Sequence, residues 1–345
     1  MNRKVYIVTK KKKKRRKLAF IIMAPILLLF LAASAYAVSL YMKAESVADS
    51  SFESLDGSSK ELAEVSNSVE NMSVLFIGVD DSENRNFGDS TRSDALILAT
   101  FNKKDKSVKL LSIPRDSYVY VPEKDRNTKI NHAYAYGGAR TTVETVEELM
   151  GFDIDYYVRM NFYAFIDIID ALGGIEVDVP YELREKDSTD KNNAIYLKEG
   201  LQTVDGEEAL AFARTRHMDN DIERGKRQQQ VMEAVIDKAA SISSFTKFAD
   251  LIDAIGNNMK TNLTFSQMKS LLAFAVTNTN ELTTETLQLQ GEDGYIDDVY
   301  YFILDEEALE ETKESMEAHL KGISKKSADL AQEDQSLNED DNDDL

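Results

Sequence analysis

The chain has 345 residues and a formal net charge of −20, with 61 Asp and Glu against 41 Lys and Arg. This length suffices for one large domain or two small ones with appendages, and the acidity excludes a general nucleic-acid-binding protein. Because the sequence contains no Cys, it also excludes a disulfide framework, a thiolate zinc site and a thiol nucleophile.

The N-terminus predicts a membrane anchor. Segment 1–17 holds ten Lys and Arg and no acid, and segment 18–42 carries no charge at all. An apolar segment of this length crosses about 30 Å of hydrocarbon, and basic residues before a span keep that end in the cytoplasm. A cleaved signal peptide is the alternative, since Ala33-Ser34-Ala35 resembles a cleavage site. However, the apolar region of a signal peptide usually spans only about 7 to 15 residues.

Three further segments follow the predicted anchor. Residues 43–72 are polar and rich in Ser and Glu, which predicts an extracellular stalk. The C-terminal end is strongly acidic and closes on NEDDNDDL, which predicts a disordered tail over 323–345. Segment 73–322 between them alternates strand-like and helix-like patterns and is predicted to form the folded domain.

Short apolar runs in this domain predict buried strands, and a helical period of apolar residues predicts helices. We expect strands at 74–79, 95–101, 108–114, 156–160 and 175–180, with further candidates at 283–291 and 299–304. We expect helices at 141–150, 161–172, 205–213, 221–240, 243–256, 265–276 and 305–320. This alternation is typical of an α/β sandwich, here with a central mixed sheet flanked by helices.

Polar side chains gather where the predicted strands end. Asp80 directly follows the strand at 74–79, and Arg115 follows the strand at 108–114. Arg92 and Asp94 precede the strand between them. Since sites in open α/β sheets lie beyond strand ends, these four side chains are plausible neighbours. Taken singly, an Asp at such a boundary is more often only a turn former.

A second cluster of cations lies in the stretch FARTRHMDNDIERGKRQQQ at 212–230. Arg214 and Arg216 point to the same side if their segment is extended, whereas Arg224, Arg227 and Gln228 share one face of the predicted helix. A solvated helix face with ordinary surface pairs is the alternative. Because Arg predominates and suits bidentate binding of oxyanions, we favour a phosphate or pyrophosphate site.

A phosphate site beside carboxylates suggests a divalent cation. Asp80 and Asp94 supply the hard oxygen ligands that Mg²⁺ accepts together with water and substrate phosphates. Asp94 is a candidate general base as well. A metal ligand is a poor free base, so activation of the attacking hydroxyl by Mg²⁺ is the alternative.

Five ordered motifs resemble the LytR–CpsA–Psr family, and most closely its wall-teichoic-acid transferase branch in Gram-positive bacteria. They are LFIGVD (75–80), STRSD (90–94), SIPRD (112–116), KINHAY with GG (129–138) and ARTRHMDNDIERGKRQQQV (213–231). The resemblance covers roughly residues 73–235, with a compatible remainder to about 322. It implies a membrane-anchored extracellular ligase of the α/β sandwich type, with 73–322 as its catalytic domain.

The resemblance implies that a glycopolymer moves from polyprenyl pyrophosphate to the MurNAc 6-hydroxyl of peptidoglycan through a phosphodiester. It implies Mg²⁺, replaceable by Mn²⁺, on Asp80 and Asp94. The loop after the first strand leaves Asp81 as an alternative to Asp80. Asp94, Arg115 and Arg92 are then the catalytic residues. The implied pyrophosphate ligands are Arg92, Arg115, Arg214, Arg216, Arg224 and Gln228, with Arg227 nearby.

The family also binds its lipid tail in an apolar tunnel, and Phe162, Phe165 and Ile169 lie on one predicted helix face that could line it. Ordinary core packing explains these residues equally well. In the KINHAY motif, Asn131 is a candidate hydrogen-bond partner near the site, and we do not assign His132 as a base.

Hydrolysis of the same pyrophosphate is a possible side reaction of this enzyme. The competing functions are a protein that binds polyprenyl phosphate or polymer without turnover and a cell-envelope regulator. A regulator that binds DNA is disfavoured because only the short segment 1–17 precedes the predicted span. The sequence leaves open which glycopolymer is carried and how many copies associate.

Overall fold

The structure is a computed structural model that describes residues 31, 34–55, 71–80, 91–215, 221–241, 251, 256–279 and 281–323. Contacts divide the chain into two compact units, Met1–Ser46 and Val47–Leu345. Residues 34–51 are helical, and within the described ranges we find no helix with the length and apolar character needed to cross a bilayer. The predicted anchor at 18–42 lies mainly outside these ranges, and residues 1–17 lie wholly outside them. The anchor, stalk and tail therefore stay predictions.

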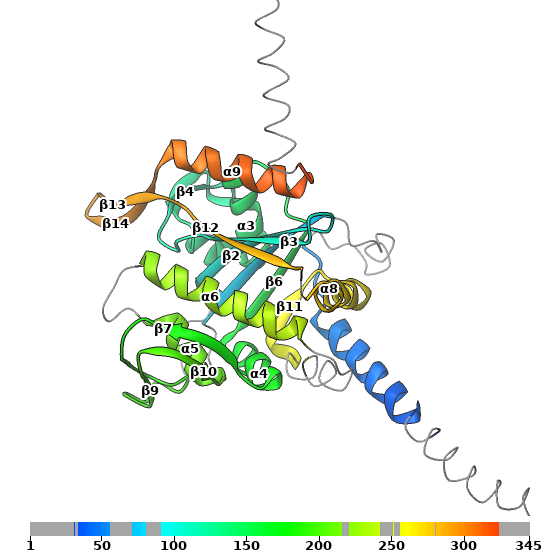
Figure 1. Cartoon of the computed structure of the whole chain (residues 1–345). Helices are drawn as coiled ribbons and strands as arrows, with labels where there is room; N and C mark the ends of the chain where they lie inside the picture. Colours follow the sequence, from blue (N-terminus) through cyan, green and yellow to red (C-terminus); the bar gives the residue numbers. More distant parts are fainter. Residues whose placement is uncertain are drawn as a thin grey trace, which may run out of the picture. The chain divides into compact units, whose positions relative to one another are not determined.

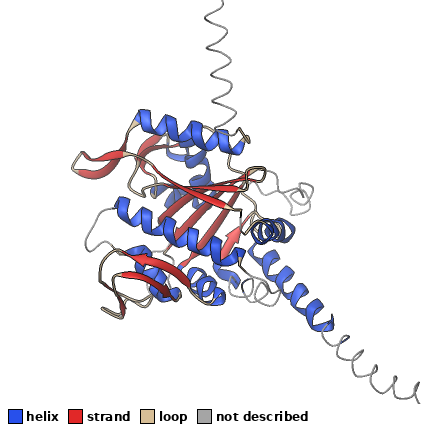
Figure 2. Ribbon diagram, viewed as in Figure 1, coloured by secondary structure: helices blue, strands red, loops and turns tan. Residues whose placement is uncertain are grey.

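A six-stranded mixed sheet lies at the centre of the second unit (Figure 2), as predicted. Its strand order is β11-β6-β1-β2-β3-β12. β1 runs parallel to β6 and β3 runs parallel to β12, whereas the other neighbouring pairs are antiparallel. The strands are β1 (Met72–Val79), β2 (Ser93–Asn102), β3 (Ser107–Ser112), β6 (Tyr156–Asn161), β11 (Met259–Thr261) and β12 (Thr283–Gln288).

Helices cover both faces of this sheet (Figure 1). They are α3 (His132–Met150), α6 (Asp221–Ala240), α8 (Phe265–Thr277) and α9 (Glu306–Leu320). On one face, Leu75, Leu96 and Leu111 form a buried cluster with side chains of α3 and α9. On the other face, alternate residues such as Ile97 and Leu110 are buried, and side chains of α6 pack against them. This division follows from the strand period of two, because successive side chains point to opposite faces.

A smaller layer packs against α6. It contains a separate two-stranded sheet of β7 (Ile175–Val179) and β10 (Gly200–Val204), together with α4 (Phe162–Leu172) and α5 (Gly206–Arg214). The strand predicted at 175–180 therefore exists, but it pairs with β10 and lies outside the central sheet. The remaining short elements are β4 (Tyr118–Val121), η2 (Pro122–Lys124), β5 (Arg126–Lys129), β8 (Leu183–Glu185), β9 (Ile195–Leu197), η3 (Gly256–Asn258), β13 (Gly291–Ile296) and β14 (Val299–Leu304).

Local capping explains where several helices begin and end. The Asp205 side chain accepts from the Glu208 amide in a capping box at the start of α5. Helix α3 begins at His132, well before the predicted start at 141, and is broken at Gly137 and Gly138. Gly138 has φ of 67°, a left-handed conformation that glycine adopts without strain. The helix predicted at 243–256 lies mostly outside the described residues.

Candidate active site

One edge of the central sheet collects the strand ends that the sequence singled out. β1, β3, β6 and β12 all run in one direction, so their carboxyl ends meet there, together with the start of β2. Asp80 follows β1 at this edge and is only 7% exposed. Arg115 follows β3, and Asp94 lies at the start of β2.

A β-bulge sets the position of Asp94. Gly78 pairs with Ala95 whereas the next residue, Val79, pairs with Ser93, so Asp94 is the extra residue of β2. A bulge bends its strand and redirects the side chain of the extra residue, and bulges are frequent beside active sites. The irregularity therefore places the Asp94 carboxylate apart from the regular ladder, at the edge where Asp80 also lies.

Arg115 is held between two carboxylates. Its Nη1 donates to Asp94 Oδ1 at 2.5 Å, and its Nε lies 3.6 Å from Asp116 Oδ2. The other oxygen of Asp116 lies 2.9 Å from Lys129 Nζ. Asp116 is only 7% exposed, so the contact that it makes with Arg115 is shielded from water and orients the guanidinium, whereas the Asp94–Arg115 pair is partly exposed.

The part that Asp116 and Lys129 play in this chain of charges was not predicted. Both belong to motifs of the resemblance, SIPRD and KINHAY. Their only signal was proximity in sequence to Arg115 and Asn131, because a contact between the turn after β3 and the end of β5 cannot be read from local spacing.

Arg92 lies close enough to His132 to affect its ionisation. Burial lowers the pKa of His132, and the positive charges of Arg92 and Lys129 lower it further. The ring Nδ1 of His132 lies 2.9 Å from the Thr128 hydroxyl. These surroundings favour a neutral imidazole and a positive local potential, which suits an anionic ligand at Arg92.

Buried polar atoms at this edge lack hydrogen bonds. Among the described residues, most of the buried side-chain atoms without a hydrogen-bond partner come from segments that we assign to the site. They are Ser93 Oγ, Arg115 Nε, Asn131 Oδ1 and Thr215 Oγ1. Since buried polar groups in proteins are normally paired, such a concentration is a typical feature of a ligand-binding region.

The carboxyl end of α5 and the first turns of α6 pack together beside this edge of the central sheet, and we call this unit the elbow. Buried Arg227 of α6 donates from Nε to the Phe212 carbonyl at 3.1 Å and from Nη2 to the Thr215 carbonyl at 2.6 Å. Gln228 donates to the Ala213 carbonyl at 3.4 Å. These bonds satisfy carbonyls at the carboxyl end of α5. They give Arg227 and Gln228 structural contacts in addition to the pyrophosphate role that we predicted for them.

The predicted arginines of the elbow differ in their placement. Arg214 is the last residue of helix α5 and not part of an extended segment, and its guanidinium lies 4.6 Å from the centroid of the Phe162 ring. Arg224 is buried on α6. Arg216 lies outside the described residues, as does Asp81. The expectation that Arg214 belongs to an extended segment is therefore wrong, because Arg214 is helical.

Gly225 allows α6 to approach the end of β3. A Cβ at this position would lie 2.7 Å from the Ser112 hydroxyl oxygen. Ser112 belongs to the same SIPRD motif as Arg115, so the close approach brings the first turns of α6 to the same edge as Arg115. On α6, Gln229 reinforces the contact by donating to carbonyls of both β3 and β12.

The residues predicted for a lipid tunnel have two kinds of environment. Ile169 is fully buried in the core between α4, α5 and the β7–β10 sheet. Phe165 packs partly buried against the same core, and Phe162 lies under Arg214. Ile169 therefore has a packing role, and a tunnel lined by Phe162 and Phe165 stays a prediction.

The donor set fits a metal held partly by substrate. The described residues contain no group of three or more His, Cys, Asp or Glu suited to hold a metal. Two carboxylates, Asp80 and Asp94, lie at the ends of paired strands at the same edge. Mg²⁺ is commonly bound by one or two carboxylates, with phosphate oxygens and waters completing its shell, so this set fits Mg²⁺.

Comparison with known proteins shows which family the chain belongs to. Residues 38–318 match the LytR_cpsA_psr family. The polyisoprenyl-teichoic acid–peptidoglycan teichoic acid transferase TagT of Bacillus subtilis (strain 168) is 38% identical over 297 residues, covering 85% of this chain and 91% of that protein. An uncharacterized protein of Staphylococcus aureus (strain NCTC 8325 / PS 47) is 42% identical over 235 residues, covering 67% of this chain and 57% of that protein.

A solved structure of YwtF (TagT), a LytR-CPS2A-psr family protein with bound octaprenyl pyrophosphate lipid, shares the fold. It is 37% identical, with a TM-score of 0.59, and the match covers 74% of this chain and 92% of that chain. Together with the match of the family over most of the sequence, these relatives establish the assignment. The chain belongs to the LytR–CpsA–Psr family.

Proposed function

We propose that this protein is a phosphotransferase that is anchored in the cell membrane by one span and carries its catalytic domain outside the cell. The donor is a glycopolymer, assigned to wall teichoic acid, on polyprenyl pyrophosphate. The acceptor is the MurNAc 6-hydroxyl of peptidoglycan. The names of the relatives, which are teichoic acid transferases, support the reaction class, and the lipid in the YwtF (TagT) structure supports a polyprenyl pyrophosphate donor.

The proposed reaction replaces a phosphoanhydride bond of the donor with a phosphoester bond to the acceptor. The acceptor hydroxyl oxygen forms a bond to the phosphorus that carries the glycopolymer. The bond from that phosphorus to the bridging oxygen breaks, and polyprenyl phosphate leaves with the electron pair. The hydroxyl proton is released, so the products are a phosphodiester, polyprenyl phosphate and one proton.

Different residues at this edge neutralise charge, bind the pyrophosphate and bind the metal. Arg115, fixed by Asp94 and Asp116, lies ready to neutralise charge on the transferring phosphoryl group. The rest of the pyrophosphate is held by Arg92, Arg214, Arg216 and Arg224. Arg227 and Gln228 fix the elbow that carries Arg214 and Arg224 and also contribute to the binding of the pyrophosphate. Asp80 and Asp94 would hold Mg²⁺. When bound there, the metal would neutralise charge on the phosphate oxygens.

A single observation carries the proposal. The Asp94–Arg115 pair lies at a bulged strand end, at the edge of the sheet where buried polar atoms also lack hydrogen bonds. An ion pair with only a structural role would not require a strand bulge or unpaired buried polar atoms around it. An anion that accepts from Arg115 and a cation that binds Asp94 would separate the pair and complete both sets of contacts.

Reconstitution tests the proposal. Full-length protein in detergent or nanodiscs is incubated with a polyprenyl-pyrophosphate glycan, peptidoglycan fragments and Mg²⁺, and the phosphodiester product is measured by mass spectrometry. We expect product in the wild type and none detectable for Asp94→Ala. Asp178→Ala, which alters an exposed carboxylate on β7, is the matched control and should retain full activity.

Three outcomes would contradict the proposal in different ways. Absence of the phosphodiester under every metal condition would contradict the transferase. Release of polyprenyl phosphate without a linked product would leave only a pyrophosphatase. Wild-type transfer by Asp94→Ala would show that the site has been misplaced.

A further inference from the structure

The β13–β14 hairpin presents an aromatic face to solvent. Its turn residues, Asp297 and Asp298, both have positive φ, 50° and 62°, as a tight two-residue hairpin turn requires. Just before and after the turn, Tyr295 and Tyr300 are directly paired across the strands, so their rings lie on one face. The ring centroids are 5.8 Å apart in an edge-to-face arrangement, and Tyr295 is 75% exposed. Such exposure of a large ring is a feature of binding surfaces.

The orientation of this face is fixed. The Tyr300 hydroxyl donates to Asp293 Oδ1 at 2.8 Å, which holds the second ring on its own strand pair. Tyr301, the next residue, packs edge-to-face against Tyr118 with ring centroids 4.9 Å apart. We define Tyr295 and Tyr300 as the tyrosine platform. Because Tyr301 follows Tyr300 in the strand, its side chain leaves the opposite face, where it braces the hairpin against Tyr118. Figure 1 shows the hairpin projecting beside β4, the strand that carries Tyr118.

The tyrosine platform is joined directly to the candidate active site. The Phe302 amide donates to the Asp116 carbonyl at 2.9 Å, and Phe302 also forms a bridge with Ser117. Lys129 Nζ contacts Asp116 and lies 5.3 Å and 5.7 Å from the rings of Tyr300 and Tyr301. Tyr300 is two residues from Phe302, which is about 7 Å along a strand. The platform thus begins about 7 Å along β14 from Phe302, which contacts the segment that carries Arg115, and this distance is comparable to the length of one sugar unit.

The charges on the hairpin indicate which of the two substrates binds to the tyrosine platform. The hairpin carries four exposed acids, Glu292, Asp293, Asp297 and Asp298, and segment 289–304 contains no Lys or Arg. The one cation described at the rings, Lys129, is already paired with Asp116. These carboxylates would repel a polymer of repeating phosphates. They would instead accept hydrogen bonds from hydroxyl and amide groups of an uncharged saccharide, whose C–H faces pack on tyrosine rings. The donor polymer is therefore disfavoured on this surface, and the acceptor glycan is favoured.

We infer that the tyrosine platform binds the glycan backbone of the acceptor, a chain of N-acetylated hexosamines, and directs its free hydroxyl toward Arg115. This inference rests on the proposed transferase function and adds to it a second substrate subsite. Arg side chains hold the pyrophosphate on one side of Asp116, and tyrosine rings hold the sugar on the other.

Variants of Tyr295 test the inference, because its exposed ring makes no core contact whose loss would unfold the protein. Full-length protein is assayed for transfer, and KM is measured separately for acceptor and donor. Loss of one aromatic contact is expected to raise the acceptor KM of Tyr295→Ala by about three- to tenfold. The donor KM should stay unchanged, and Tyr295→Trp should restore the acceptor KM. Tyr196→Ala, which removes a 43% exposed ring on β9, is the matched control.

A direct binding measurement separates this inference from the proposed reaction. Binding of a soluble β-1,4-linked N-acetylglucosamine oligosaccharide is followed by calorimetry without donor. Weaker binding by Tyr295→Ala than by Tyr196→Ala supports the platform even if no transfer is observed in any assay. Normal transfer by Tyr295→Ala with an unchanged acceptor KM overturns the platform and leaves the transferase intact. A raised donor KM instead would assign the tyrosines to the donor polymer and also overturn the inference.

Discussion

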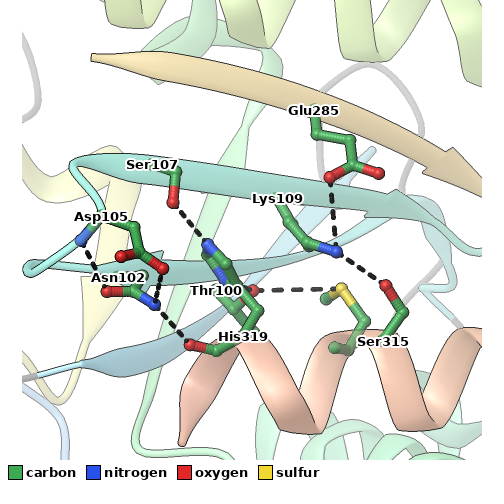
Figure 3. A network of polar contacts seen from close by, with 9 residues as sticks. Thr100, Asn102, Asp105, Ser107, Lys109, Glu285, Ser315 and His319 are labelled. Atoms are coloured by element: carbon green, nitrogen blue, oxygen red, sulfur yellow. Dashed lines mark hydrogen bonds and ion pairs between the residues drawn. The ribbon is translucent and has the colours of Figure 1, made fainter. Parts of the chain in front are cut away.

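The two ends of strands β2 and β3 differ in how completely their buried polar groups are hydrogen-bonded. At the end away from the candidate site, side chains from both strands form a closed network with helix α9 (Figure 3). His319 lies 2.8 Å from the Thr100 hydroxyl through Nδ1 and 2.8 Å from the Ser107 hydroxyl through Nε2. Lys109 donates to the Ser315 hydroxyl at 2.7 Å and lies 3.3 Å from Glu285.

At the other end of the same strands, the polar groups are close together but incompletely paired. Ser93 Oγ and Arg115 Nε are buried and make no hydrogen bond within the described part of the chain. The closed network stabilises the fold because every member bonds another member. The edge with Asp94 and Arg115 is stabilised less by its own contacts and is suited to bind a ligand. Polar residues of similar type therefore serve stability at one end and binding at the other.

The largest expected effect concerns Arg115. If this guanidinium contacts the transferring phosphoryl group, Arg115→Ala should lower kcat/KM for transfer by about 10²- to 10³-fold. The free energy of unfolding should change by less than about 1 kcal/mol, because the ion pair with Asp94 is partly exposed. Transfer kinetics and urea denaturation measure the two quantities. The exposed Arg140→Ala is the control, and a large loss of stability with little loss of transfer would reverse our distinction between the two ends.

The next prediction concerns the pH dependence of the closed network. Burial, with Lys109 nearby, lowers the pKa of His319 from 6.5 to about 4, although Asp105 and Glu285 act in the opposite direction. Since the unfolded chain takes up the proton first, the contribution of His319 to stability is complete above pH 6.5. It declines as the pH falls toward 4, by an amount on the order of 3 kcal/mol.

Urea denaturation between pH 7 and pH 4 measures this decline. The variant His319→Asn does not titrate, so its stability should fall less steeply than that of the wild type over this range. Donor binding at pH 7 should be the same in both proteins. Equal slopes for the two proteins would show that His319 is not buried in its neutral form.

The smallest of the three effects concerns Arg227, which lies at the binding end but bonds to backbone. Arg227→Met keeps the apolar stem and leaves the carbonyls of Phe212 and Thr215 without this donor. We expect a loss of stability of about 2 kcal/mol and a smaller loss of donor affinity than for Arg115→Ala. Denaturation and calorimetry with the same protein batch test this order. A loss of affinity without a loss of stability would make Arg227 a direct ligand and not a support of the elbow.

Sequence patterns predicted most strands of the central sheet and its long helices, because apolar periodicity specifies them locally. The shorter strands β4, β5, β8, β9, β10, β11 and β13 were not predicted. The strands around Leu75, Leu96 and Leu111 and the helix of α6 follow from apolar periodicity. Strand ends predicted that Asp94 and Arg115 would be neighbours, and their side chains do contact each other. These features depend on spacing along one element or on the general layout of an α/β sheet.

Other features depend on contacts between distant segments and could not be predicted. The bulge at Asp94 depends on the register between β1 and β2. The pairing of Asp116 with Lys129 joins the turn after β3 to the end of β5. Arg227 was predicted to share a polar helix face with Arg224 and Gln228, but tertiary packing buries it against backbone carbonyls. Gln229, which the sequence did not single out, is buried in the same way. The placement of β7 outside the central sheet likewise depends on which strand it meets.

The most direct test of the central claim is calorimetric titration of the full-length protein with geranyl pyrophosphate and Mg²⁺, a short and soluble analogue of the donor. The wild type and His319→Asn should bind with the same affinity, whereas Arg115→Ala should bind at least tenfold more weakly. Equal binding by all three proteins, or weaker binding by His319→Asn alone, would contradict the assignment of the Asp94–Arg115 edge as the pyrophosphate site.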